Sequence, residues 1–304
     1  MKPIEHTAAQ DPFRLRRARP RGGNRSVPFD LVIQGRHIDD TGIGALARLC
    51  KAARWRRLGP GAARLAGADR SADIAAACAD LKLDHALVPA QARLADFGLV
   101  AMDMDSTLIN IECIDELADL AGIKSQVAAI TRSAMRGEMD FAESLTRRVM
   151  LLAGLDAAAL DQVYEKRLRL APGAERMIEG LKALGIRTSL VSGGFNFFTD
   201  RLRARLGLDY AFSNEPEIED GRLTGRIVGP VLDAGGKAEK LRIVRDKLGI
   251  GSKQVIAIGD GANDLAMMAE AGVSIAYRAR PVVQAKATYS FNHVGLDGLL
   301  NLFL

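Results

Sequence analysis

Two aspartates placed two residues apart, Asp103 and Asp105, follow the short apolar run Leu99–Met102. A short apolar run bounded by polar residues indicates a buried strand, and the two carboxylates stand where that strand ends. In an open parallel sheet, ligands bind beyond the carboxyl ends of the strands. A strand-end turn is the alternative interpretation, because Asp and Ser are common turn residues. The two aspartates therefore need support from the rest of the chain before they indicate catalysis.

Three more polar clusters stand at predicted strand ends or helix starts further along the chain. They are Ser192-Gly193-Gly194, Lys237, and the group Asp260, Asn263 and Asp264. Each cluster alone is compatible with an ordinary turn. Four such clusters at one predicted sheet edge are hard to explain by chance, so we expect them to form a single functional site.

The residue types in this predicted site indicate phosphoryl chemistry supported by a metal ion. Several carboxylates that converge on one point repel one another unless a cation neutralises them. Oxygen ligands without His or Cys favour a hard ion such as Mg²⁺, which leaves coordination positions for water and phosphate oxygens. The Ser192 hydroxyl, the backbone amides of the glycine turn and the charge of Lys237 are partners for a phosphate group. The sequence therefore predicts a magnesium-assisted phosphoryl site.

The elements that position these residues follow an alternating pattern. From residue 97 to the last residue, strand-like apolar runs alternate with helical segments, which predicts a doubly wound, mostly parallel α/β sheet. Helical segments punctuated by glycines fill residues 112–169, after the first strand. This block predicts a helical cap that excludes water from the active edge and selects the substrate. Asp220-Gly221, between two alternating runs, predicts a hairpin.

Two regions precede the predicted catalytic domain of residues 96–304. Residues 29–95 predict a small α/β region with a strand, two helices and a return strand, and the glycines of GPGAARLAG are interpreted as a turn. Regulation, oligomerisation and inert packing all remain open as roles for this region. Residues 1–28 form a basic tail with six arginines and no acid between Arg14 and Arg25. A solvated, disordered tail is favoured over a nucleic-acid arm, because aromatic residues for base stacking are nearly absent there.

Composition limits the cellular setting and the classes of metal site. The three cysteines, Cys50, Cys78 and Cys113, show no CxxC spacing, and the four histidines are scattered, so neither a disulfide framework nor a zinc site is expected. No apolar run reaches the roughly 18 residues of a membrane-spanning helix. The N-terminus lacks the apolar segment of a secretion signal. We expect a cytoplasmic protein with no membrane partner; the sequence does not predict its oligomeric state.

The polar clusters stand in the order and context of four known motifs. DMDST, VSGG, Lys237 and GDGAND resemble the motifs of the haloacid dehalogenase superfamily of phosphotransferases. The longer strings DMDSTLINIECIDELA, SLTRRV, VSGGF and GDGANDLAMM are similar to those of the phosphoserine phosphatase family within it. This similarity runs from about residue 97 to the last residue. It implies a Rossmann-like (HAD-like) fold and the hydrolysis of O-phospho-L-serine to L-serine and phosphate, the last step of serine biosynthesis.

The resemblance implies roles for the four aspartates. Asp103 is the nucleophile that forms an aspartyl phosphate, which splits a difficult hydrolysis into two easier displacements. Asp105 is the general acid and then the general base, so its pKa is expected to be raised. Mg²⁺ is held by Asp103, the backbone carbonyl of Asp105, and Asp260, while Asp264 orients these ligands.

The resemblance also assigns the residues that bind the substrate. Those that bind the phosphoryl oxygens are Ser192, Gly193, Lys237 and Asn263. Glu112 and Arg148 pair with the ammonium and carboxylate groups of phosphoserine, and Arg binds a carboxylate through two hydrogen bonds. By pattern alone, Arg148 is also compatible with a solvated arginine of a cap helix, and Glu112 with an acid in the first turn of a helix.

Two other functions remain open from the sequence. A related phosphatase or phosphotransferase could act on another small phosphomonoester, and altered pairing by Glu112 and Arg148 would be its signature. A catalytically dead regulatory binding protein belongs to a different class, and it would lack catalytic residues that this chain retains. We expect the partner to be a small-molecule substrate and not a nucleic acid.

Overall fold

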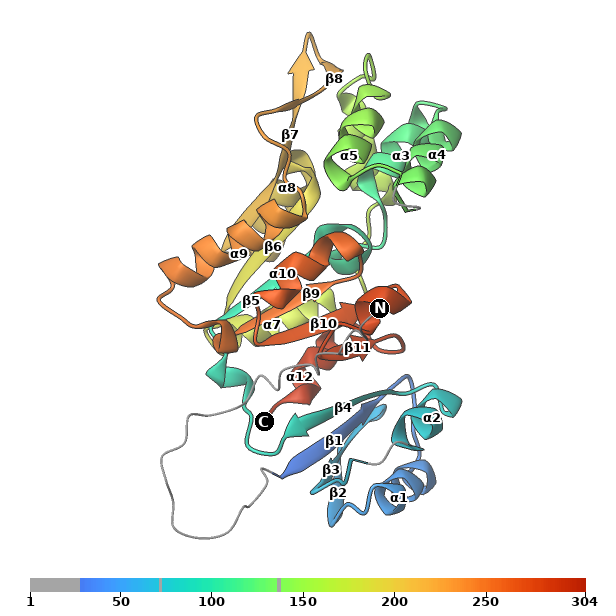
Figure 1. Cartoon of the computed structure of the whole chain (residues 1–304), viewed down its shortest axis with the longest axis vertical. Helices are drawn as coiled ribbons and strands as arrows, with labels where there is room; N and C mark the ends of the chain where they lie inside the picture. Colours follow the sequence, from blue (N-terminus) through green and yellow to red (C-terminus); the bar gives the residue numbers. More distant parts are fainter. Residues whose placement is uncertain (1–27, 71–72, 136–137) are drawn as a thin grey trace, which may run out of the picture.

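The computed structural model describes residues 28–70, 73–135 and 138–304, which form two β-sheets (Figure 1). Nearly all of the predicted basic tail, residues 1–28, lies outside the described residues. Within the described residues, no helix is both long and apolar enough for a membrane crossing. The larger sheet lies between the helical cap and the smaller sheet (Figure 1).

The larger sheet has seven strands in the order β11-β10-β9-β5-β6-β7-β8. All neighbours in it are parallel except β7 and β8, which are antiparallel. This arrangement confirms the predicted mostly parallel α/β sheet. The strands are β5 (Leu99–Met102), β6 (Arg187–Phe195), β7 (Tyr210–Glu219), β8 (Arg222–Val228), β9 (Val255–Gly259), β10 (Val273–Tyr277) and β11 (Tyr289–Phe291).

Helices cover both faces of this sheet, as the doubly wound pattern predicts. Side chains of β5 alternate between two cores, with Val100 and Met102 in one and Leu99 and Ala101 in the other. Burial of each large apolar side chain contributes about 1.5–3 kcal/mol. The first core includes α7 (Ala174–Ala183), α8 (Asn196–Leu206) and α12 (Leu299–Leu302). The second includes α9 (Ala234–Lys247), α10 (Leu265–Ala269) and α11 (Pro281–Gln284).

The chain segment between β5 and β6 folds into the predicted helical cap. Its elements are α3 (Cys113–Leu120), α4 (Lys124–Met135), α5 (Phe141–Met150), α6 (Ala158–Gln162) and the helical turn Val163–Arg167. The N-terminus of α5 is capped by the Asp140 side chain, which accepts a hydrogen bond of 2.8 Å from the Glu143 N–H. A side-chain acceptor at this position satisfies a backbone donor that the helix itself cannot pair.

The hairpin of β7 and β8 attaches the cap to the sheet. Its turn is made by Asp220 and Gly221, with φ angles of 49° and 73°, as the Asp-Gly pair predicts. Backbone N–H groups of Gly154 and Ala157 in the cap donate to carbonyls of Leu223 and Gly221, each over 2.8 Å. The hairpin and α5 accordingly lie side by side in Figure 1. The cap is therefore held by the hairpin as well as by its own two connections.

The smaller sheet is antiparallel, with the strand order β2-β3-β1-β4. Its elements are β1 (Phe29–Gln34), α1 (Asp40–Leu49), β2 (Arg54–Gly59), β3 (Ala62–Ala66), α2 (Asp73–Asp80) and β4 (Asp84–Pro89). The interpretation of GPGAARLAG as a turn is correct only for its first residues, because Ala62–Ala66 is a strand. Strands β2 and β3 are not among the predicted elements, because β2 is largely exposed and Ala, frequent in β3, is uncommon in strands.

Buried polar contacts join the smaller sheet to the last residues of the chain. The Asp84 carboxylate accepts hydrogen bonds from three consecutive backbone N–H groups, over 2.8 Å from Asn292, 2.8 Å from His293 and 3.1 Å from Val294. Arg64 is 3% exposed; it pairs with Asp30 at 3.2 Å and donates to a carbonyl of α12. The two sheets are therefore fixed to each other by groups that could not be buried without these partners.

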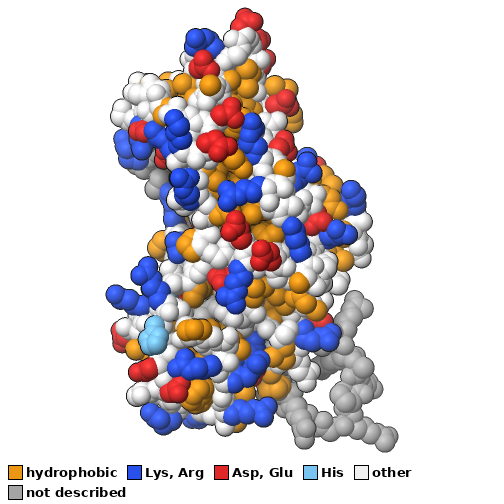
Figure 2. Space-filling model, turned by 180° about the vertical axis from the view of Figure 1, so that it is seen from behind, with side chains coloured by type: hydrophobic (Ala, Val, Ile, Leu, Met, Phe, Trp, Pro, Cys, Tyr) orange, Lys and Arg blue, Asp and Glu red, His pale blue; other side chains and the backbone are white. Residues whose placement is uncertain are grey.

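The exposed charges of the described residues are mixed in sign. Figure 2 shows basic and acidic side chains interspersed over the face turned away in Figure 1. Exposed ion pairs such as Arg201 with Asp161, at 3.1 Å, contribute little to stability individually. The basic excess of the whole chain thus does not appear as a single basic area on this face.

Candidate active site

Asp103 directly follows β5 at the carboxyl edge of the large sheet. Its backbone N–H donates to the Ile258 carbonyl of β9 over 3.0 Å, which places the ends of β5 and β9 side by side. The residue is only 5% exposed. Burial and the charge of Asp264 raise the pKa of Asp103 well above its usual range, although Lys237 opposes this shift. The carboxylate therefore lies where water is scarce and other charges are close.

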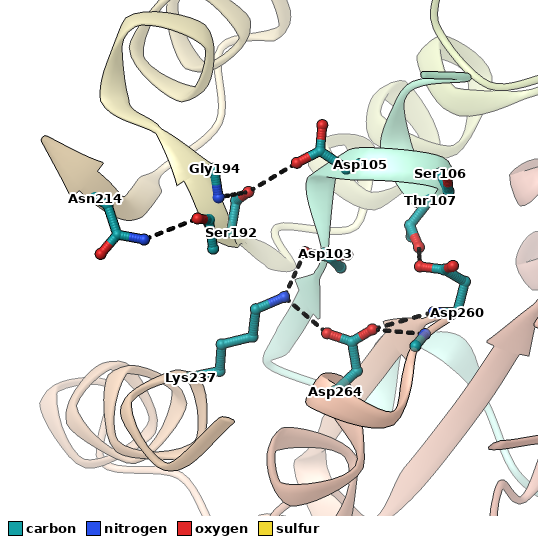
Figure 3. A network of polar contacts seen from close by, with 12 residues as sticks. Asp103, Asp105, Ser106, Thr107, Ser192, Gly194, Asn214, Lys237, Asp260 and Asp264 are labelled. Atoms are coloured by element: carbon teal, nitrogen blue, oxygen red, sulfur yellow. Dashed lines mark hydrogen bonds and ion pairs between the residues drawn. The ribbon is translucent and has the colours of Figure 1, made fainter. Parts of the chain in front are cut away.

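Lys237 connects two of the carboxylates from the first turns of α9. Its Nζ lies 2.5 Å from Asp103 Oδ1 and 2.8 Å from Asp264 Oδ1, and its side chain has no exposed surface (Figure 3). Burial alone would lower the pKa of Lys237, but the charges of Asp103 and Asp264 outweigh burial and raise it. Asp233 caps α9 by accepting from the Gly236 N–H over 2.8 Å. The lysine is thus held as a cation at the site.

A second group of contacts surrounds Asp260 and Asp264, which follow β9. The Asp264 Oδ2 accepts from the backbone N–H groups of Asp260 and Gly261, over 3.2 and 3.0 Å. Asp260 Oδ1 accepts from the buried Thr107 hydroxyl over 3.1 Å. Burial and the charge of Asp264 raise the pKa of Asp260 to about 6. These contacts fix the positions of two carboxylates that repel each other.

The three carboxylates fit a hard cation. One oxygen each from Asp103, Asp260 and Asp264 lies within 4.8 Å of the others, and this is the one such cluster of potential metal ligands within the described residues. Burial, together with the charges of the neighbouring carboxylates, raises the pKa values of Asp103 and Asp260 although Lys237 acts against this, so a cation bound here would be favoured. All-oxygen ligand sets of this kind are typical of Mg²⁺ and related ions. Asp264 belongs to this carboxylate cluster, although it is not one of the predicted Mg²⁺ ligands. Its ion pair with Lys237 is compatible with the predicted role of orienting those ligands.

Asp105 lies in the loop Met104–Leu108, where Ser106 adopts a φ of 54°. One oxygen of Asp105 accepts from the Cys113 N–H at the start of α3 over 3.0 Å, and the other accepts from the Ser192 hydroxyl over 3.4 Å. Burial raises the pKa of Asp105, although these hydrogen bonds act against the shift. A buried carboxyl with a raised pKa can hold a proton and donate it, as a general acid must.

Ser192, Gly193 and Gly194 lie in the last part of β6, where the pairing with β7 is interrupted between Val191 and Phe195, and we call this irregular segment the Ser192 turn. The Ser192 hydroxyl accepts from the Gly194 N–H over 2.9 Å and donates to Asp105 (Figure 3). A Cβ atom at Gly193 would lie 2.7 Å from the Phe141 ring of the cap, so a larger residue would clash with that ring. The turn therefore lies against Asp105 on one side and under the cap on the other.

The remaining predicted residues are less closely joined to this network. The Glu112 carboxylate accepts from the Ser106 hydroxyl over 2.7 Å. The pKa of Glu112 is raised by partial burial of the carboxyl and by the charge of Asp105, although part of the Glu112 surface is exposed to solvent. Arg148 donates to a carbonyl of its own helix over 3.4 Å and, within the described part of the chain, forms no ion pair. Asn263 lies in the turn before α10 and makes no side-chain hydrogen bond within the described residues.

The sequence pattern of the haloacid dehalogenase-like hydrolases matches residues 97–272, more than half of the chain. The chain belongs to the haloacid dehalogenase-like hydrolases. This hydrolase also matches a domain of unknown function over residues 31–74, within the smaller sheet and its helices.

Curated relatives of this hydrolase are phosphoserine phosphatases. That of Polaromonas sp. strain JS666 is 55% identical over 215 residues, which cover 69% of this chain and 91% of the relative. That of Haemophilus influenzae is 49% identical and covers 73% of this chain and 71% of its own. These matches confirm the resemblance stated from the motifs.

Solved structures show the same architecture. The unliganded probable phosphoserine phosphatase of Vibrio cholerae has a TM-score of 0.80 at 35% identity, with 91% of this chain and 86% of that chain covered. A substrate-bound phosphoserine phosphatase complex has a TM-score of 0.65 at 38% identity, with 68% and 99% covered. The hydrolase fold and the helical cap therefore have close structural counterparts.

Two residues of this network were missed by sequence reasoning. The sequence predicts no separate role for Thr107 within its motif, yet the Thr107 hydroxyl fixes Asp260. Asn214 was not singled out, yet its side-chain amide contacts the Gly193 carbonyl over 2.8 Å. A signal for Asn214 exists in the sequence, because Asn is uncommon within strands and here interrupts a strand-like run.

Proposed function

We propose that this hydrolase converts O-phospho-L-serine and water to L-serine and phosphate, the last step of serine biosynthesis. The observation that carries this proposal is the buried group of Asp103, Lys237 and Asp264, with ion pairs of 2.5 and 2.8 Å, beside the Ser192 turn. It provides a nucleophile and a phosphate-binding cation at one point. The related phosphoserine phosphatases described above support the choice of substrate.

The metal ion in this proposal is Mg²⁺. Asp103, Asp260 and the backbone carbonyl of Asp105 would hold it, and Asp264 would orient them through its contacts with Lys237 and two backbone N–H groups. When bound, the ion would neutralise the carboxylates and the phosphoryl oxygens that approach them. The all-oxygen donors of the carboxylate cluster support this choice.

Hydrolysis proceeds by two displacements at phosphorus. In the first, an Asp103 oxygen forms a bond to phosphorus, the bond from phosphorus to the seryl oxygen breaks, and Asp105 gives its proton to that oxygen. In the second, Asp105 takes a proton from water, whose oxygen attacks phosphorus and releases Asp103. The raised pKa of Asp105 supports the first role. Both steps pass through similar charge distributions at phosphorus, so one set of phosphoryl contacts serves both.

Three groups from two elements stabilise the transferring phosphoryl group. Lys237 supplies a fixed positive charge from α9, and Ser192 and the backbone N–H of Gly193 supply hydrogen-bond donors from the end of β6. Because they are positioned before the reaction, little reorganisation is needed when charge develops. We assign Asn263 to the same group on its position beside Asp264.

The cap determines the substrate in this proposal. Glu112 would pair with the ammonium group and Arg148 with the carboxylate of phosphoserine. In support, Arg148 forms no direct ion pair within the described residues, although it is partly buried on α5 and its charge acts on the Asp115 carboxylate. Phe141, which lies over Gly193, would exclude water from the phosphoryl site.

We also propose a division of the chain and a location. Residues 96–304 would form the phosphatase domain, with the cap over about 112–169, and residues 29–95 would form a separate unit. In support, the smaller sheet and its helices have a hydrophobic core of their own. The buried, unpaired cysteines Cys50, Cys78 and Cys113 suit the reducing cytoplasm.

Phosphate release tests this proposal. Wild type and Asp103→Asn would be assayed on O-phospho-L-serine and other small phosphomonoesters, with Mg²⁺ or with chelator. We expect strong preference for phosphoserine, and loss of activity in the variant and with chelator. Metal-dependent release from another ester would retain the mechanism and overturn the substrate. No release from any ester would favour a regulatory binding protein.

A further inference from the structure

Asn214 is a buried amide that contacts two separate parts of the active site. Its Nδ2 donates to the Gly193 carbonyl over 2.8 Å, and its Oδ1 accepts from the Leu232 N–H over 2.7 Å. The residue is only 2% exposed. Since one partner is a carbonyl and the other an N–H, only one orientation of the amide satisfies both. The side chain is therefore fixed in place and direction.

The contact between Asn214 and the Gly193 carbonyl lies where the pairing of β6 with β7 is interrupted. Strands β6 and β7 pair at Val191 with Phe212 and again at Phe195 with Asn214, so β6 has two more residues than β7 in this interval. The extra length forms the turn of Ser192, Gly193 and Gly194 and breaks the ladder there. The Asn214 side chain donates to the Gly193 carbonyl within this unpaired interval. The turn thus depends on this amide for its shape.

The peptide group between Gly193 and Gly194 is held at both ends. Its carbonyl accepts from Asn214, and its N–H donates to the Ser192 hydroxyl oxygen over 2.9 Å. That hydroxyl in turn donates to Asp105 over 3.4 Å. Asn214 thus begins a chain of hydrogen bonds that ends on the proposed general acid, as Figure 3 shows. A shift of the amide would change the direction of the Ser192 hydroxyl and of the Gly193 peptide.

The second contact leads to the catalytic lysine. Leu232, which donates to Asn214, precedes Asp233, the residue that caps α9. Lys237 accordingly lies five residues beyond this anchor, and its own N–H donates to the Asp233 carbonyl over 2.8 Å. One side chain thereby ties the phosphate-binding turn of β6 to the start of the helix that carries Lys237.

We propose that Asn214 is a positioning residue for phosphoryl transfer. It sets the relative positions of the Ser192 turn and the start of α9 without touching the reacting atoms. This inference rests on the phosphoryl-transfer chemistry proposed above. Small displacements of groups that stabilise a transition state have large effects on rate, because their hydrogen bonds must point to where charge develops.

Two substitutions test the proposal on the full chain. Asn214→Ala removes both hydrogen bonds and leaves a space, whereas Asn214→Leu removes them at similar side-chain volume. We expect kcat to fall by about 10- to 100-fold in both, with KM within about threefold, because the contacts to the amino acid come from the cap. Asn301→Ala, which loses a 3.1 Å hydrogen bond to Gln34, is the matched control and should keep kcat. Thermal unfolding of each variant verifies folding.

A double-variant cycle separates positioning from general damage to the fold. If Asn214 acts through the Ser192 turn, Ser192→Ala combined with Asn214→Ala will lower kcat by much less than the product of the single effects. Multiplicative effects, or a kcat within twofold of wild type in both folded Asn214 variants, would overturn the inference.

The assay uses O-phospho-L-serine and p-nitrophenyl phosphate in parallel. If the wild-type protein hydrolyses p-nitrophenyl phosphate but not phosphoserine, the proposed substrate is refuted. The effect of the Asn214 substitutions on kcat would still be measured with p-nitrophenyl phosphate. A wild type active on both, with unchanged kcat in the variants, would refute the role of Asn214 alone.

Discussion

Lys237 and Asp264 form an ion pair in which neither side chain has exposed surface, with 2.8 Å between Nζ and Oδ1. A buried ion pair offsets its desolvation only while both partners remain. Removal of one partner typically costs about 3–5 kcal/mol, because the other charge stays buried and unpaired. Lys237 also pairs with Asp103, so its loss would leave two carboxylates without their cation.

Lys237→Met should therefore impair both stability and catalysis. We expect the free energy of unfolding to fall by about 3 kcal/mol and kcat to fall by about 10³-fold, since the variant loses a charge that stabilises the transferring phosphoryl group. Urea unfolding and phosphate release measure the two effects. Lys247→Met, at the exposed end of the same helix, is the control and should change neither by much. Activity within threefold of wild type in Lys237→Met would contradict the proposed site.

Asp105→Asn should separate the two chemical steps. Without a proton donor, the release of serine is slow, and we expect kcat on phosphoserine to fall by about 10²–10⁴-fold. An aryl phosphate has a better leaving group that needs no proton, so the first step persists while the water attack lacks its base. Rapid-mixing assays with p-nitrophenyl phosphate should show a burst near one equivalent of nitrophenol, followed by slow turnover.

Two variants control the burst experiment. Asp103→Asn should give no burst, because it lacks the nucleophile. Asp119→Asn, which changes an exposed cap residue paired with Arg167 at 2.6 Å, should resemble wild type. A burst in Asp103→Asn, or unchanged steady-state rates in Asp105→Asn, would reverse our assignment of the two aspartates.

The sequence could predict that residues far apart in the chain meet at one edge of the large sheet, because this follows from the order and direction of the strands. Asp103 and Asp260 each follow a buried strand, Ser192 lies in the last part of another, and the carboxyl ends of parallel strands share an edge. The role of Asn214 was not predictable in this way. It arises from the unequal lengths of β6 and β7 between two pairing points, and only the paired strands reveal that register.

The smaller sheet was predicted incompletely for a different reason. Strand β2 lies at the edge of its sheet with most side chains exposed, so it lacks the alternation that marks a half-buried strand. Arg64 in β3 reads as a surface residue, yet it is buried because Asp30 and carbonyls of α12 pair with it. The partners that allow Arg64 to be buried lie far away in the sequence, so the local sequence pattern does not reveal them.

Asp209 should make stability depend on pH. Its carboxylate accepts from the Thr188 N–H over 2.9 Å and pairs with Arg187 at 2.6 Å, and despite partial burial these partners lower its pKa. A carboxyl with a lowered pKa in the folded state stabilises above its unfolded pKa, near 3.9, and loses that contribution as pH falls through the folded pKa.

Asp209→Asn should therefore lower the free energy of unfolding by about 1–2 kcal/mol at pH 7, with a smaller difference from wild type below pH 4. Urea unfolding at pH 7 and pH 3.5 measures this. Asp161→Asn, whose partner Arg201 lies 3.1 Å away on the surface, should change stability by less than about 0.5 kcal/mol at both pH values. An equal loss at both pH values in Asp209→Asn would mean that the charge is unimportant.

Gly225 should control the position of the cap. It lies in β8 with a φ of 85°, and a Cβ atom there would lie 3.0 Å from Ala153 Cβ and 3.0 Å from the Met150 carbonyl oxygen, at the end of α5. Gly225→Ala would push against α5, which carries Arg148. Because Arg148 is proposed to bind the substrate carboxylate, we expect KM for phosphoserine to rise about 3- to 10-fold. KM for p-nitrophenyl phosphate, which lacks that carboxylate, should change by less than about twofold.

Gly229→Ala is a matched control for this effect. Gly229 has a φ of 75°, and a Cβ atom there would meet nothing within 4 Å. Both variants carry the backbone cost of an alanine at positive φ, about 1–2 kcal/mol, but only Gly225→Ala adds the contact with the cap. Equal KM values for phosphoserine in the two variants would show that the hairpin does not position α5. A higher KM in Gly225→Ala alone would assign substrate selection to the contact between hairpin and cap.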